Sequence, residues 1–156
     1  MKKTKRYVNT LAFQMDVTAR LYHNLSQKLF NKDVKNNISL EEYIVLDTIV
    51  CYPQIDANML AKTLIKEKAV IDKILSKLIK RKLLLEIKPK GKDIQVKHFE
   101  LTKEGCRIYN EVIPKNDGMA GVLAKFMTDT ELMAFAKTLL KIKNIMISLS
   151  EVDYKN

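Results

Sequence analysis

The segment 39–101 constrains the fold most, because three short helical patterns in it are followed directly by two extended ones. The first helix begins at "SLEE", where Ser39 is placed to be the N-cap and Glu42 to reach back and complete a capping box. We expect this helix to run to about Cys51, because Pro53 disfavours helical geometry in the residue before it.

Two more short helices follow closely. Asp56 is placed to cap the first, 57–65, and the second covers about 67–82. The residues predicted to face inward are Met59, Leu60 and Leu64 in the former, and Ile71, Ile74, Leu75 and Leu78 in the latter. The second set has the spacing i, i+3, i+4, i+7 of one buried helix face. Two helices joined by so tight a turn are typical of a helix-turn-helix.

The pattern then becomes extended. Residues 83–88, "LLLEIK", and 94–101, "IQVKHFEL", suit two strands, and residues 89–93 supply the turn of a hairpin between them. One of only four glycines in the chain, Gly91, lies at the tip, where it permits a tight turn and a close approach to another backbone. A hairpin directly after a helix-turn-helix is a wing.

A long helix is predicted before this middle part. Residues 8–29 carry a seam at alternating steps of three and four, the narrow stripe of a helix that meets another helix, from this chain or from a second copy. Thr18 is the only polar member of the seam, which consists of Val8, Leu11, Met15, Thr18, Tyr22, Leu25 and Leu29. A polar linker is expected at 31–37.

Helices also follow the hairpin. Thr102 is placed to cap a helix that reaches about Phe126, with a kink or break at Pro114, Gly118 and Gly121. A second capping box, "TDTE" at 128–131, opens a last helix to about Ser150. Its inward positions are predicted to be Leu132, Phe135, Ala136, Leu139, Ile142, Met146 and Leu149. The predicted fold class is mostly α (α+β): a winged helix-turn-helix between long N- and C-terminal helices.

The charge of the chain indicates the partner. A formal net charge of +10 favours nucleic acid or an acidic membrane surface over a neutral small substrate. Between residues 62 and 97, twelve basic and four acidic residues give +8, so most of the excess lies in under a quarter of the chain. A charge that served solubility alone would be spread evenly. The distribution therefore favours nucleic acid, bound by the helix-turn-helix and the hairpin.

The helix 67–82 is placed to enter a DNA major groove, where base edges are distinguishable. Lys73 is positioned to donate to guanine, Asp72 to accept from cytosine, and Ala69 or Val70 to touch a thymine methyl group. Lysines of the wing, about 88–97, would neutralise phosphates or lie along the minor groove. Each residue alone is equally compatible with a solvated surface. The predicted DNA-binding residues are Lys66, Lys68, Ala69, Val70, Asp72, Lys73, Ser76, Lys77, Lys80, Lys88, Lys90, Gly91, Lys92 and Lys97.

The order of elements resembles the MarR family of winged helix-turn-helix transcriptional regulators over nearly the whole chain. The resemblance rests on "SLEEYIVLDTI", "DANMLAKTLIKEKAVIDKILSKLIKRKLL" and "KDIQVKHFELTKEG". Leu101, Thr102 and Gly105 match the family's "LT-x-x-G". The family implies a homodimer formed by the first and the last two helices, a pseudo-palindromic operator in double-stranded DNA, and a small-molecule or redox signal that releases a repressor.

That resemblance implies three parts: an N-terminal dimerisation helix at 1–36, a winged helix-turn-helix DNA-binding domain at 37–102, and C-terminal dimerisation helices at 103–156. The residues expected to form the dimer contact are Val8, Leu11, Met15, Leu132, Leu139, Ile142 and Met146.

The sequence departs from the family at three places. Asp93 is followed by Ile94 and Gln95, where family members commonly have two arginines in the wing. Glu67 replaces the usual Ser or Thr at the start of the recognition helix, and Lys82 stands where a glycine is usual. These departures leave open a second hypothesis: a winged-helix adaptor or architectural protein that binds nucleic acid without sequence specificity, or an acidic protein.

Other residues could carry a signal. Tyr22, Tyr43, Tyr109 and Met119 are candidates for a small-molecule effector pocket, although aromatic residues at helical spacing are more often plain core. Cys51 and Cys106 are either a redox pair or sensor, or small buried hydrophobic residues. The two histidines, His23 and His98, do not have a metal-ligand spacing, so neither a metal nor a cofactor is expected.

No catalytic role is predicted, because the sequence has neither a phosphate-binding glycine loop nor a recognisable set of nucleophile, base and orienting residue. Two cysteines are too few for a disulfide framework, which favours a reducing compartment. No stretch approaches the roughly 18 apolar residues of a membrane span. We therefore expect a cytoplasmic protein without a membrane segment.

Overall fold

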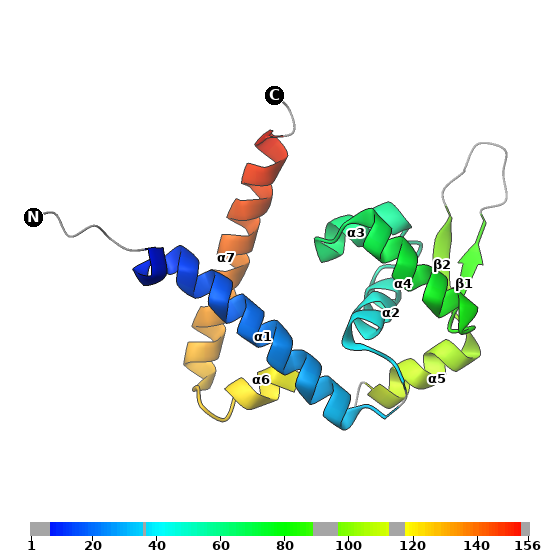
Figure 1. Cartoon of the computed structure of the whole chain (residues 1–156), viewed down its shortest axis with the longest axis horizontal. Helices are drawn as coiled ribbons and strands as arrows, with labels where there is room; N and C mark the ends of the chain where they lie inside the picture. The colour runs from blue at the N-terminus through cyan, green and yellow to red at the C-terminus, as the bar shows by residue number, and fades with distance from the viewer. Residues whose placement is uncertain (1–6, 36, 89–96, 113–117, 154–156) are drawn as a thin grey trace, which may run out of the picture. The chain divides into compact units, whose positions relative to one another are not determined.

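The computed structural model of the chain describes residues 7–35, 37–88, 97–112 and 118–153. They fall into two compact units, which divide between Asn116 and Asp117. The first unit contains a short 3₁₀ turn η1 (Tyr7–Asn9), α1 (Leu11–Asp33), α2 (Leu40–Cys51), α3 (Ala57–Leu64), α4 (Lys68–Lys80), β1 (Leu84–Ile87), β2 (His98–Leu101) and α5 (Lys103–Val112); the second contains α6 (Gly118–Leu123) and α7 (Asp129–Asp153) (Figure 1).

The first helix is displaced from its predicted bounds. Thr10 is its N-cap, with the side-chain oxygen accepting from the backbone N–H of Phe13 at 3.3 Å. The backbone N–H of Val34 donates to the carbonyl of Phe30 at 2.9 Å, so the last turn closes at Asp33. The prediction that a linker begins at residue 31 is therefore wrong. Residues 31–33 are polar, but they continue the helix, and polar composition alone does not mark where a helix ends.

The predicted caps of α2 and α3 are confirmed. The Ser39 side chain accepts from the Glu42 backbone N–H at 3.2 Å, and the Glu42 carboxylate accepts from the Ser39 backbone N–H at 2.8 Å. The Asp56 carboxylate accepts from the backbone N–H groups of Asn58 and Met59 at 2.6 and 2.8 Å. Both helices thus begin at the residue where a side chain satisfies their first free donors.

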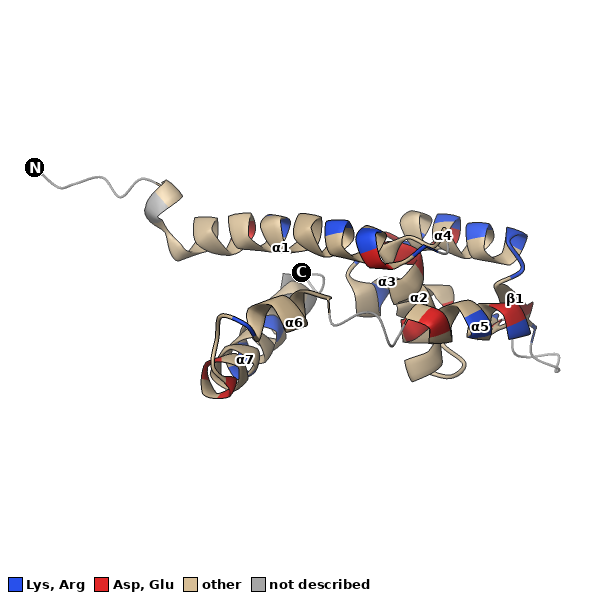
Figure 2. Ribbon diagram, turned by 90° about the horizontal axis from the view of Figure 1, so that it is seen from below, with Lys and Arg blue, Asp and Glu red and all other residues tan. Residues whose placement is uncertain are grey.

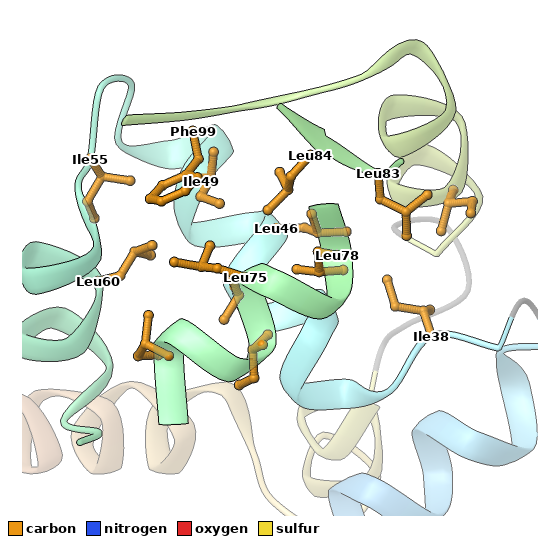
Figure 3. Packing of buried hydrophobic residues seen from close by; sticks show 14 of the residues in the cluster. Ile38, Leu46, Ile49, Ile55, Leu60, Leu75, Leu78, Leu83, Leu84 and Phe99 are labelled. Atoms are coloured by element: carbon orange, nitrogen blue, oxygen red, sulfur yellow. The ribbon is translucent and has the colours of Figure 1, made fainter. Parts of the chain in front are cut away.

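The core of the first unit lies between α2, α3, α4 and the hairpin (Figure 3). All four residues predicted on the inner face of α4 are buried: Ile71, Ile74, Leu75 and Leu78. They pack with Leu46 and Ile49 of α2, Leu60 of α3, and Leu84 and Phe99 of the two strands. The inward prediction for Met59 is wrong, since its side chain is 54% exposed. An eight-residue helix that buries Leu60 and Ala61 turns the preceding residue outward.

The strands form a two-stranded antiparallel hairpin in which Leu84 pairs with Leu101 and Ile87 with His98. Both are shorter than the predicted 83–88 and 94–101. The predicted tip at 89–93, with Gly91, lies outside the described residues, as do residues 94–96.

The base of the hairpin is locked by the two residues of the "LT-x-x-G" sequence that follow β2. The Thr102 hydroxyl donates to the Lys82 carbonyl at 2.7 Å and accepts from the Gly105 backbone N–H at 2.9 Å, so Thr102 caps α5 as predicted. The Thr102 backbone N–H donates to the Leu83 carbonyl at 3.0 Å. A side chain at Gly105 would meet that carbonyl, because its Cβ would lie 2.1 Å from the Leu83 oxygen. Only glycine lets α5 pass so close to the start of the wing.

The second unit confirms the second capping box. Helix α6 begins at Gly118 and continues through Gly121, so the interruption predicted at Gly121 is wrong, while Pro114 lies outside the described residues. The Glu131 carboxylate accepts from the Thr128 backbone N–H at 2.8 Å, and Thr128 in turn accepts from the Glu131 N–H at 3.3 Å. Helix α7 then continues to Asp153, a few residues past the expected end. Within the described part of this single chain, none of the positions predicted to face inward on α7 is buried.

Candidate nucleic-acid interface

The exposed side of α4 carries the residues predicted to enter a DNA groove. Ala69, Lys73, Ser76 and Lys80 are all exposed. They lie at i, i+4, i+7 and i+11 and therefore form one stripe, opposite the buried stripe of the same helix. We call these four residues the outer stripe. Figure 2 shows basic residues recurring along α4. Val70, Asp72 and Lys77, also predicted to bind DNA, flank the stripe, and the Asp72 side chain is half-buried.

The turn between α3 and α4 is tight because of its backbone conformation. Ile65 has a φ of 50°. Its backbone N–H donates to the Lys62 carbonyl at 3.3 Å, and the Lys66 N–H donates to the Ala61 carbonyl at 2.9 Å. This pair of bonds is the Schellman motif, which usually has glycine at the residue with positive φ. A β-branched residue there is rare and strained, and the Ile65 side chain is 75% exposed.

The end of α4 repeats this geometry at Lys82, whose φ is 58°. The Lys82 N–H donates to the Ile79 carbonyl and the Leu83 N–H to the Leu78 carbonyl, both at 2.9 Å. The positive φ explains why glycine is usual at this position in the family that the sequence resembles. Lysine adopts the same left-handed conformation here, but with some strain. At the start of α4, Glu67 makes no side-chain capping bond, as its residue type predicts.

Four of the predicted DNA-binding lysines already have an acidic partner in the protein. Lys66 contacts Glu41 of α2 at 2.8 Å, Lys68 contacts Asp72 at 2.6 Å, Lys77 contacts Glu42 at 3.0 Å, and Lys97 contacts Glu86 across the hairpin at 2.8 Å. Among the described residues, no such partner is found for Lys73, Lys80 or Lys88. Among the predicted DNA-binding lysines that the structure describes, those free to meet a phosphate or a base therefore lie on the outer stripe and at the start of the wing.

Two of these pairs line a cavity of about 350 Å³ between α3, α4 and the base of the hairpin. Its walls are Asp56, Ala57, Asn58, Lys68, Asp72, Glu86, Lys97 and Phe99. The ion pair with Lys68 occupies one carboxylate oxygen of Asp72, the residue that sequence analysis assigned to a cytosine contact. The pair partly neutralises the Asp72 charge and leaves its other oxygen able to accept a hydrogen bond.

Glu42 lies beneath the flank of α4 and joins it to α2. Its side chain is almost fully buried, and one carboxylate oxygen contacts the Lys77 ammonium at 3.0 Å and the Arg81 guanidinium at 3.1 Å, while the other accepts from Ser39. Burial raises the pKa of Glu42, but the Ser39 N–H, Lys77 and Arg81 lower it further, so the pKa lies below the ordinary 4.5. The sequence predicted only the capping role of Glu42, because its partners on α4 lie 35 and 39 residues further along the chain.

The wing is described only at its two ends. Lys88 and Lys97 are exposed there. Lys90, Gly91 and Lys92 lie outside the described residues, so their predicted contacts with phosphates stay a prediction.

Two of the four predicted pocket residues come together. The rings of Tyr43 and Tyr109 stack with centroids 5.7 Å apart, and the Tyr109 hydroxyl donates to Asp47 at 2.7 Å. Burial first, and then Asp47, raise the pKa of both tyrosines. Tyr22 is exposed on α1, and no ring contact between it and Tyr43 or Tyr109 is found within the described part of the chain. Met119 belongs to the second unit.

The cysteines are not core residues. Cys51 and Cys106 are both free thiols with exposed side chains, so the alternative that they are small buried hydrophobic residues is wrong. A redox role stays a prediction. No group of three or more histidine, cysteine, aspartate or glutamate side chains within the described residues could hold a metal ion.

Solved structures share this architecture closely. The PcaV transcriptional regulator from Streptomyces coelicolor in complex with its natural ligand superimposes with a TM-score of 0.73 and 21% identity, covering 86% of this chain and 95% of its own. The chain has the fold of MarR-type regulators. The MepR–DNA complex from S. aureus gives a TM-score of 0.72 with 18% identity over 86% of this chain and 97% of that one. E. coli MarR with a cysteine-to-serine substitution, complexed with operator DNA, gives 0.70 with 20% identity over 86% and 99%.

No protein-family model matches the sequence, and no curated protein does. The winged helix-turn-helix predicted from the residue pattern is confirmed. Among the described residues, no helix has the length and apolar character needed to cross a membrane.

Proposed function

We propose that this protein is a homodimeric, sequence-specific DNA-binding transcriptional regulator of the cytoplasm, acting as a repressor until a small-molecule or redox signal releases it. The observation that carries the proposal is the outer stripe of α4: two lysines with no acidic partner among the described residues lie on the exposed side of a helix-turn-helix. Support comes from the MepR and MarR structures of the same fold, which hold those proteins in complex with DNA.

The outer stripe has the chemistry for reading a major groove. Lys73 donates to guanine acceptors, Ser76 to a base or phosphate, and the methyl group of Ala69 packs against thymine. Lys80, with Lys88 at the start of the wing, neutralises phosphates. Lysine replaces the bidentate arginine–guanine contact with a single point charge, so we expect each base contact to discriminate modestly.

The two long helices are proposed to form the dimer, with 1–36 and 103–156 as its parts and 37–102 as the DNA-binding domain. In the single chain, Leu11 of α1 and Met146 of α7 are exposed, and so are further apolar residues of η1 and of both helices: Val8, Leu21, Tyr22, Leu25, Met133, Phe135, Leu139, Leu140, Ile145 and Leu149. Apolar area on this scale needs a cover. A second copy supplies it symmetrically, and two recognition helices then reach successive major grooves about 34 Å apart.

The signal is proposed to act where α2 and α5 meet. Tyr43 and Tyr109 stack there, and α2 ends at Cys51, whose thiol is exposed. An effector or an oxidised thiol at this place would shift α5 and with it the base of the wing, which Thr102 joins to the end of α4.

Selection of bound duplexes from a random DNA pool tests the proposal. We expect an enriched inverted repeat whose half-sites are about one helical turn apart, and a solution mass of twice the 18.0 kDa of one chain. Lys73→Ala serves as the matched variant, which should enrich a weaker or altered repeat. A pool that stays random, with DNA still bound, would favour the adaptor or architectural alternative.

A further inference from the structure

The basic residues of α4 and its C-cap residue Arg81 differ in what they face. Those of the outer stripe, Lys73 and Lys80, have no acidic partner among the described residues. Lys77 and Arg81 lie on the flank that faces α2, and both contact the same carboxylate oxygen of Glu42. Their position on the helix, more than their charge, separates the two sets.

Glu42 cannot easily give up either partner. The residue is 2% exposed, and a charged carboxylate at that depth is stable only while hydrogen bonds and opposite charges compensate it. Ser39 satisfies one oxygen, so the other depends on Lys77 and Arg81. If Lys77 turned to a DNA phosphate, Arg81 alone would face the second oxygen.

The same carboxylate therefore fixes two things at once. It caps α2 through Ser39, and it holds the last turn of α4 and its C-cap residue Arg81 against the first turn of α2. The Lys77 side chain is 62% exposed, while the Arg81 side chain is 27% exposed. These contacts and the buried face of α4 together fix the rotation of the helix about its own axis, which decides where the outer stripe points.

We infer that Glu42, Lys77 and Arg81 are positioning residues that orient the recognition helix, and that α4 contacts the DNA through the outer stripe of Ala69, Lys73, Ser76 and Lys80 and not through Lys77. This inference rests on the proposed function and reassigns Lys77, which the sequence pattern placed among the DNA contacts. A small change in the orientation of α4 would displace the side chains that contact bases. Because base contacts need sub-ångström placement, such a displacement would cause a large loss of sequence preference.

The test compares the salt dependence of DNA binding for Lys77→Met and Lys80→Met, two substitutions of one residue type on one helix. Loss of one phosphate contact decreases the magnitude of the slope of log K against log salt by about 0.9, or about 1.8 for the two copies in a dimer. We expect Lys80→Met to show this decrease and Lys77→Met to keep the wild-type slope while losing preference for the selected site. An equal decrease for both variants would overturn the inference.

Glu42→Gln supplies a second readout, because the amide oxygen still accepts from Ser39 while the charge is gone. We expect its ratio of selected-site to random-DNA affinity to fall by roughly tenfold or more, with far-UV circular dichroism unchanged. Adding Lys77→Met should cause no further fall, since Lys77 acts through Glu42. Losses that multiply in the double variant would contradict the inference. Absence of any slope change for Lys73→Met and Lys80→Met would instead overturn the proposed function.

Discussion

Gly105→Ala should destabilise the protein strongly although it adds one methyl group. The new Cβ would lie 2.1 Å from the Leu83 carbonyl oxygen, whereas real Cβ atoms essentially never come closer than 3.0 Å to another heavy atom. Either α5 or the start of the wing must therefore move by about 0.9 Å. The obstacle is backbone, which cannot rotate away as a side chain would.

The magnitude follows from what that movement disturbs. Overpacking of this kind costs about 1–3 kcal/mol. The two hydrogen bonds at Thr102, from its N–H to the Leu83 carbonyl and from Gly105 to its hydroxyl, contribute roughly 0.5–1.5 kcal/mol each. Alanine returns about 1 kcal/mol through its better helix propensity. The net loss is about 1–5 kcal/mol, a sizeable part of the roughly 5–15 kcal/mol of a typical domain.

Urea unfolding followed by circular dichroism measures this loss, at one protein concentration because a dimer's stability depends on it. With an m-value of about 2 kcal/mol per molar, the midpoint should fall by about 0.5–2.5 M. Cys106→Ala, the next residue and exposed, is the control and should change stability by less than about 0.5 kcal/mol. A Gly105→Ala midpoint equal to that of the control would refute the close approach of α5 to Leu83.

Three further outcomes are expected. Ile65→Gly should raise stability by about 1 kcal/mol because it relieves a φ of 50°, whereas Ile65→Val, still β-branched, should not; equal midpoints would contradict the strain. The pKa of Glu42 lies below 4.5, so the stability its charge provides is present above that pH and lost as pH falls further, and the wild-type advantage over Glu42→Gln should shrink in acid rather than stay constant. In filter binding, Lys73→Ala should weaken selected-site binding more than random-DNA binding, whereas replacing Lys90 and Lys92 should weaken both and make the salt slope shallower; equal effects on both DNAs would undo the assignment of α4 as the recognition helix.

Local features of the fold could be predicted from the sequence, since each is decided within a few residues. The Ser39 and Thr128 capping boxes, the Asp56 cap and the four buried residues of α4 rest on spacing alone, and the structure confirms them. The strand pairing and the role of glycine in "LT-x-x-G" followed less directly. The pattern marked Gly105, but only the nearby Leu83 carbonyl shows why glycine is required.

Long-range pairing could not be predicted in this way. Nothing in the sequence around Glu42 indicates that Lys77 and Arg81 lie against it, and the positive φ of Ile65 contradicts the residue type that would be expected there. The division of the lysines into paired and unpaired sets is likewise a tertiary property. The sequence shows where the basic residues are concentrated, but only the fold shows which of the predicted DNA-binding lysines are paired with acidic side chains.

The measurement that tests the central proposal most directly is the affinity of the purified protein for DNA upstream of its own gene against a shuffled duplex, at several salt concentrations. A sequence-specific regulator should prefer the upstream DNA by roughly 10³-fold or more. That preference should persist as salt rises, because base contacts depend on salt less than phosphate contacts do. Equal affinities that fall together as salt rises would contradict the proposal. They would mean that the basic face binds DNA through charge alone, without sequence specificity.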